Sequence, residues 1–110
     1  MSIAAIQEQL PDYARDTRLN LGAFGTITSL TPQQLWGTAI ACAATCRNTA
    51  LVQAILAEAA PHLSAEAITA AKLAASIMAM NNIYYRFTHL VGNQVYRTMP
   101  ARLRMSATFV

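Results

Sequence analysis

The sequence is short of charge. Only 12% of its 110 residues are Asp, Glu, Lys or Arg, whereas 55% are hydrophobic; an ordinary soluble domain has about 25% charged residues. Acidic side chains are the scarcer kind, with five against eight basic ones, and none follows Glu66. A small chain with so few charges cannot cover its surface with them. We therefore expect part of its apolar surface to be covered by other subunits or by further protein.

The positive excess is small and does not indicate a nucleic-acid partner. The formal net charge is +3, and the arginines after Glu66 are Arg86, Arg97, Arg102 and Arg104. Nucleic-acid sites usually have a dense basic patch or a recognisable aromatic motif. This sequence has neither a lysine-rich run nor an RNA-binding aromatic signature, so we expect no nucleic acid to bind.

Long hydrophobic runs are also missing. A membrane-spanning helix needs about 20 apolar residues, and the longest apolar tract here is interrupted by Lys72 and by Asn81-Asn82. The start, MSIAAIQEQLPDYARD, lacks the basic segment followed by a hydrophobic block that marks a secretory signal. We expect no membrane association and a cytoplasmic, reducing location.

Cysteine is scarce as well. Cys42 and Cys46 are the only two, which excludes a disulfide framework. On a helix, residues four apart have Cβ atoms about 5–6 Å apart, whereas a disulfide needs about 3.8 Å. As metal ligands the two lack partners, because His62 and His89 lie at no recognisable ligand spacing. We expect two reduced, largely buried thiols at small core positions.

The remaining titratable residues predict no active site. His62 precedes a helix cap, which favours a turn or surface position, and His89 lies near a helix C-terminus, where the dipole favours the protonated ring. Glu58 lies on an otherwise apolar helix, so it is either solvated or buried and paired. No Ser-His-Asp set, phosphate-binding glycine loop or carboxylate pair is present. We assign no catalytic, cofactor-binding or metal-binding residue.

Helix signals are abundant, and no strand-like alternation is long enough to build a sheet. The segment from Ser64 to Leu90 is rich in alanine, with Ser64 as N-cap and Gly92 as the stop. We interpret it as the central helix. One face would carry Leu73, Ile77, Met80, Tyr84 and Phe87. Asn81-Asn82 predicts either a polar strip or a local break.

Four helices and part of another are predicted around that segment. Thr31-Pro32-Gln33-Gln34 has the pattern of a capping box with proline at the first helical position. Connectors are expected at Gly22–Leu30 and Gly92–Pro100. The other expected helices are Ser2–Leu10, Asp12–Leu21, the stretch from Thr31 to Cys46, Asn48–Ala60, and one beginning at Ala101. The fold class predicted is all-α, a compact array of five to six helices in one domain.

Several segments together resemble the alkyl hydroperoxidase D family, within the carboxymuconolactone decarboxylase-like superfamily. The most specific is IMAMNNIYYRF at Ile77–Phe87. The others are LPDYARDTRLNLG at Leu10–Gly22, QLWGT at Gln34–Thr38, TCRN at Thr45–Asn48, AEAAPHLSAEA at Ala57–Ala67 and LRM at Leu103–Met105. Together they span nearly all of residues 1–110 and match the N-terminal half of the family.

The resemblance implies a function in antioxidant defence. Members of that family are all-helical, have two related halves and assemble as trimers. They carry electrons from a lipoylated dehydrogenase-complex subunit to a peroxiredoxin and reduce organic hydroperoxides weakly themselves. The lipoyl group belongs to the partner, so the resemblance implies no bound cofactor.

The family's redox motif is absent from this sequence. It is C-x-x-C followed four residues later by histidine, with a glutamate upstream, and it lies in the second half of the family's proteins. Cys42 and Cys46 have a different spacing and no histidine at that distance, so no catalytic role carries over to them. We expect residues 1–110 to be an N-terminal half, inactive alone, with the catalytic half beyond Val110; the apolar ending MSATFV favours this. The alternative is a catalysis-free helical oligomerisation module.

Overall fold

A computed structural model describes residues 2–103 of the chain. Within that range there are six α-helices, three 3₁₀ turns and no strand, which confirms the all-α prediction. No helix in it is both long enough and apolar enough to cross a membrane. The helices are α1 (Ile3–Gln9), α2 (Arg15–Ala23), α3 (Pro32–Thr45), α4 (Thr49–Ala59), α5 (Ala65–Leu90) and α6 (Gln94–Thr98); the turns are η1 (Asp12–Ala14), η2 (Phe24–Thr26) and η3 (Ala60–His62).

The starts of the helices follow the predicted capping residues. At α3, the Thr31 hydroxyl accepts a hydrogen bond from the Gln34 N–H at 3.2 Å, and the Gln34 side chain accepts one from the Thr31 N–H at 3.0 Å. Asn48 caps α4 and Ser64 caps α5 in the same way. These bonds satisfy amide donors that have no partner within the helix. The capping predictions are confirmed.

Small residues bring the first helices close together. The core cluster contains Ile3, Ile40, Ala43, Ala54, Ile55, Ala59 and Ala71. Ala54 and Ala59 of α4 are completely inaccessible to solvent, because an alanine side chain lets a neighbouring helix approach its backbone. Here α3 packs against both α4 and α5. We call this unit, α1 to α4 with the start of α5, the bundle.

The hairpin of α1 and α2 is tied by polar contacts. Gln7 Nε2 donates to the carbonyl of Arg18 at 3.0 Å, and Arg18 donates to the Leu10 carbonyl and to Asp12 Oδ1. The predicted connector from Gly22 begins too early, because α2 runs to Ala23 and η2 follows it. Gly22 is helical and leaves room for Gln7: a Cβ there would lie 2.5 Å from Gln7 Nε2.

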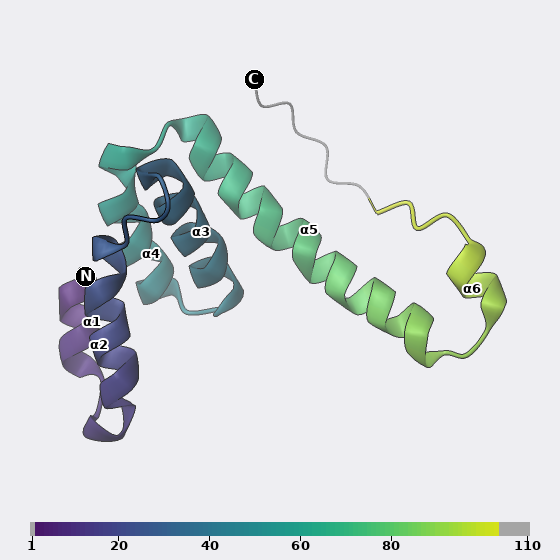
Figure 1. The fold of residues 1–110 in the computed structure, drawn as a ribbon, viewed down its shortest axis with the longest axis horizontal. Helices are drawn as coiled ribbons and strands as arrows, with labels where there is room; N and C mark the ends of the chain where they lie inside the picture. Colours follow the sequence, from purple (N-terminus) through teal and green to yellow (C-terminus); the bar gives the residue numbers. More distant parts are fainter. Residues whose placement is uncertain (1, 104–110) are drawn as a thin grey trace.

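The long helix α5 is not central along its whole length. It begins against the bundle and then extends away from it, with α6 at the far end (Figure 1). The radius of gyration is 17.2 Å, whereas a compact chain of this size has about 13 Å. The core contribution of α5 ends near Ala71. The interpretation as a central helix therefore holds only for its N-terminal part.

No break occurs at Asn81-Asn82, so that alternative was wrong. The helix runs without interruption from Ala65 to Leu90, and Asn82 is exposed while Asn81 is half-buried. An exposed helix tolerates poor helix formers at a cost of only tenths of a kcal/mol, roughly 0.7 at most for each such residue. The pair instead forms the predicted polar strip.

The segment after α5 contains a helix that the sequence analysis missed. Gly92 has φ +70 and ends α5, as predicted, because glycine adopts this conformation without steric cost. Asn93 then accepts a hydrogen bond from the Val95 N–H and starts α6, where a loop was expected. Residues 101–103 are not helical. The rest of the helix predicted from Ala101 lies outside the described residues.

Candidate functional site

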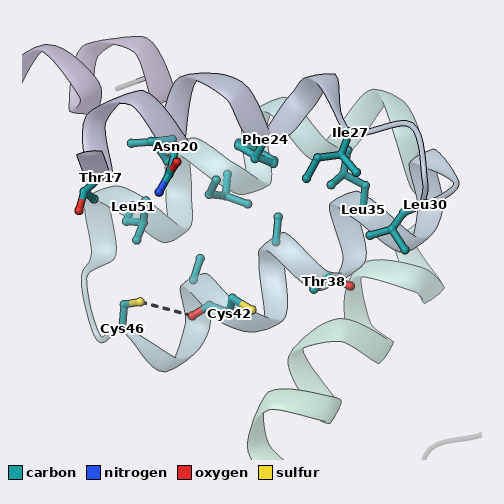
Figure 2. A pocket seen from close by; sticks show the side chains of 14 residues that line it. Thr17, Asn20, Phe24, Ile27, Leu30, Leu35, Thr38, Cys42, Cys46 and Leu51 are labelled. Carbon is teal, nitrogen blue, oxygen red and sulfur yellow. Dashed lines mark hydrogen bonds between the residues drawn. The ribbon is translucent and has the colours of Figure 1, made fainter. Parts of the chain in front are cut away.

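A groove lies beside α3 in the bundle. Its volume is about 460 Å³, and its walls come from α2, η2, the connector before α3, α3 itself and α4. Leu21, Phe24, Ile27, Leu30 and Leu35 make most of it apolar. Figure 2 shows Asn20 and Phe24 on one side and the α3 residues Thr38, Cys42 and Cys46 on the other. Apolar grooves of this size are the usual form of small-molecule sites.

Both cysteines line this groove and are exposed, so the prediction that they are largely buried was wrong. No disulfide joins them in this structure, and their reduced state stays a prediction. Cys42 lies within α3, and Cys46 is its C-cap. Because α3 stays helical through Thr45, the helical spacing on which the argument against a disulfide rested is present.

The burial of the two cysteines was mispredicted because no helix packs against their side of α3, although that side was predicted correctly. The predicted stripe Leu35, Thr38, Ala39, Cys42 and Cys46 does share one side of α3, because all five line the groove. That side faces an open hollow rather than a packed helix. Thr38, a polar residue in the middle of the stripe, was the signal in the sequence that this face is not fully buried.

The thiols have no catalytic base beside them. Cys46 Sγ donates to the Cys42 carbonyl at 3.4 Å, and the hydrogen bonds found in residues 2–103 include none from either sulfur to an imidazole or carboxylate. Among those residues, no group of three or more His, Cys, Asp or Glu side chains is placed to hold a metal ion. Peroxide chemistry with a thiolate needs an adjacent group that activates the sulfur.

The other candidate residues also lie apart from one another. His62 is exposed, as predicted, and its ring stacks on Trp36 with centroids 5.1 Å apart and planes 3° apart. Glu58 is exposed, so the alternative of a buried, paired carboxylate was wrong. His89 is exposed near the end of α5. These side chains do not form one site.

A second region stands out for its exposed apolar side chains. We call it the arm: the C-terminal part of α5 from Met78, together with α6 and Met99. Ile83 is 76% exposed and Leu90 is 69% exposed. The other large apolar residues exposed there are Met78, Tyr85, Phe87, Val91, Val95, Tyr96 and Met99. Exposed apolar surface of this kind, when it is extensive, marks a site of protein contact.

The arm holds its own shape through a few local contacts. Arg97 Nε donates to the Thr88 carbonyl at 3.4 Å, and Phe87 packs edge-to-face on Tyr96 with ring centroids 5.6 Å apart. Thr88 is buried beneath these residues, and its hydroxyl donates to the Tyr85 carbonyl. These contacts fix α6 against the end of α5.

Comparison with known proteins finds several similar sequences, which have the same name. The chain is 60% identical over 106 residues to "Alkyl hydroperoxide reductase AhpD" of Azorhizobium caulinodans, covering 96% of this chain and 59% of that protein. Proteins of the same name from a Bradyrhizobium species and from Rhodospirillum centenum are 56% and 57% identical, over 97% and 96% of this chain and 59% and 57% of their own lengths.

The chain is similar to the first part of proteins named alkyl hydroperoxide reductase AhpD. The resemblance read from Ile77–Phe87 and the other segments is thereby confirmed. The chain spans about three-fifths of the length of these curated relatives. No family model matches the chain.

Proposed function

We propose that this chain supplies the first, non-catalytic part of a lipoyl-dependent alkyl hydroperoxide reductase that serves in antioxidant defence. The observation that carries the proposal is the 60% identity to a protein named alkyl hydroperoxide reductase over 96% of the chain. The specific segment Ile77–Phe87 supports it. The groove thiols lack a neighbouring base, which is why we assign no catalytic residue to residues 1–110.

The chemistry proposed for the complete enzyme needs two thiols outside this chain. One thiolate attacks the O–O bond of an organic hydroperoxide, the alcohol leaves, and a sulfenic acid forms. The second thiol displaces water and closes a disulfide. A dihydrolipoyl group on a partner protein reduces the disulfide by thiol–disulfide exchange, and a peroxiredoxin takes electrons from the same pair. The resemblance implies the C-x-x-C of a second half for this role.

The proposal is tested by adding a second half to this chain. The purified 110-residue chain should show no steady turnover of an organic hydroperoxide with dihydrolipoamide. Co-expression with the part of the Azorhizobium caulinodans relative that this chain does not cover should restore turnover. Steady turnover by the chain alone, lost in Cys42→Ser, would contradict the assignment of the thiols to the missing part.

We also propose that this chain forms a homo-oligomer. Covering apolar surface contributes roughly 25 cal/mol per Å², and a typical interface buries about 800 Å² on each partner. The arm exposes a run of large apolar residues from Met78 to Met99. Association and ordering offset much of the gain. We expect a second copy or a second half to cover the arm, with a trimer as the state that the resemblance implies.

The state of association has a direct measurement. Light scattering at micromolar concentration should give a particle larger than 11.9 kDa. Ile83→Asp, placed on the most exposed apolar residue of the arm, should reduce that mass. A folded particle of 11.9 kDa with cooperative melting would rule out association of this chain alone.

The alternative function is a catalysis-free helical oligomerisation module. The exposed arm favours it, because such a module needs a contact surface and no redox motif. The source gene separates the two functions. A reading frame that continues past Val110 into C-x-x-C-x-x-x-H supports the reductase part, and a stop codon there supports the module.

A further inference from the structure

We propose that Cys42 and Cys46 form a two-thiolate site for a soft monovalent cation, Cu(I). Both thiols are free and exposed, and both line the same groove from adjacent turns of α3 (Figure 2). The proposal is independent of the proposed peroxide chemistry, which uses neither thiol.

The spacing suits a bridging ion better than a disulfide. A metal–thiolate bond is about 2.3 Å long, so two such bonds in line separate the sulfur atoms by about 4.6 Å. The Cβ atoms of residues four apart on a helix lie about 5–6 Å apart. Figure 2 shows the Cys42 sulfur pointing away from Cys46, so rotation of the Cys42 side chain is needed to bring both sulfur atoms to one ion, without unwinding of α3. A disulfide, in contrast, must bring the Cβ atoms to about 3.8 Å.

The ligand set selects the kind of ion. Zinc takes four ligands in structural sites, and no group of three His, Cys, Asp or Glu side chains is placed to bind a metal among residues 2–103. The sequence has no carboxylate from Thr17 to Ala57, so hard cations lack in this part of the chain the charged oxygen ligands that they prefer. Thiolates select soft ions such as Cu(I), and Cu(I) accepts two of them in a linear arrangement.

Binding changes the local bonds and charge in a defined way. Both sulfurs lose their protons, two S–Cu bonds form, and two protons go to solvent. The hydrogen bond from Cys46 Sγ to the Cys42 carbonyl is lost in the process. The complex carries one net negative charge, and Arg47, which follows Cys46 in the sequence, is exposed.

The test is an anaerobic competition for Cu(I) between the reduced 110-residue chain and the chromophore bicinchoninate. The unchanged chain should withdraw one equivalent. Cys42→Ser and Cys46→Ser should each weaken binding by more than the roughly 10- to 100-fold that loss of a supporting partner costs a metal site. X-ray absorption should show two sulfur ligands on the copper.

A matched control variant keeps two thiols but places them on different sides of α3. The double variant Cys42→Ser with Ala44→Cys has two cysteines that lie two residues apart and so point to different sides of α3. It should bind as weakly as the single variants, with unchanged helicity by circular dichroism. Equal affinity in this variant, or copper that joins two chains in native mass spectrometry, would overturn the site.

Discussion

The bundle and the arm both contain many hydrophobic residues but bury them to opposite degrees. Ala54 and Ala59 in the bundle are fully buried, whereas Ala79 in the arm is exposed. The same contrast holds for isoleucine, since Ile40 is 1% exposed and Ile83 is 76% exposed. Within the described residues the bundle helices pack on several neighbours, whereas the arm part of α5 packs only on the short helix α6. A hydrophobic residue contributes to stability only through the surface that covers it.

Substitution of Ile40 and of Ile83 should give the largest difference in stability between the bundle and the arm. Ile40→Ala should lower the free energy of unfolding by about 2–5 kcal/mol, because it leaves a cavity in the core. Ile83→Ala should change it by less than about 0.5 kcal/mol for an isolated chain. Urea denaturation at two protein concentrations checks this. A loss with Ile83→Ala that grows with concentration identifies the arm as an interface; equal losses at both positions would remove the distinction between the regions.

Alanine substitutions at two glycines should have opposite effects on stability in the arm and in the bundle. Gly92 has φ +70, so Gly92→Ala should cost about 1–2 kcal/mol and loosen α6 from α5. Gly37 lies in α3 with nothing within 4 Å of an added Cβ, so Gly37→Ala should stabilise the bundle by about 0.5–1 kcal/mol. Hydrogen exchange should show faster exchange in α6 for the first variant only. A destabilising Gly37→Ala would mean that the exposed side of α3 is covered.

Removal of a helix cap should give a smaller difference in stability between the bundle and the arm. Thr31→Ala removes the capping box of α3 and should cost about 1 kcal/mol of global stability. Asn93→Ala removes the cap of the short helix α6 and should cost only a few tenths globally, because α6 opens without the bundle. Thermal melts give both values. A larger loss from Asn93→Ala would show that arm and bundle unfold together.

The exposed thiols should produce the smallest change in stability. Cys42→Ser and Cys46→Ser should each stay within about 0.5 kcal/mol, as surface substitutions do. Titration of the native chain with a thiol reagent should find two thiols that react quickly. A slow reaction that becomes fast only in denaturant would show that both cysteines are buried and would contradict the open groove.

The sequence alone determined most of the local structure. The cap at Thr31, the stop at Gly92 and the continuous alanine-rich helix from Ala65 depend on residues a few positions apart, so their physics is readable from short segments. It also determined the shared face of α3 and the resemblance to AhpD proteins. The short helix α6 escaped prediction because a single turn after an asparagine cap leaves almost no periodic signal.

Only the tertiary structure decided which faces are covered. Cys42 and Cys46 lie on the predicted side of α3, yet that side borders a groove, because α2 and η2 leave a hollow there. Within residues 2–103, no neighbouring element covers the side chains of Ile83 and Leu90 on α5. Periodicity tells which residues share a face of a helix, and burial depends on whether another element, distant in sequence, packs against that face.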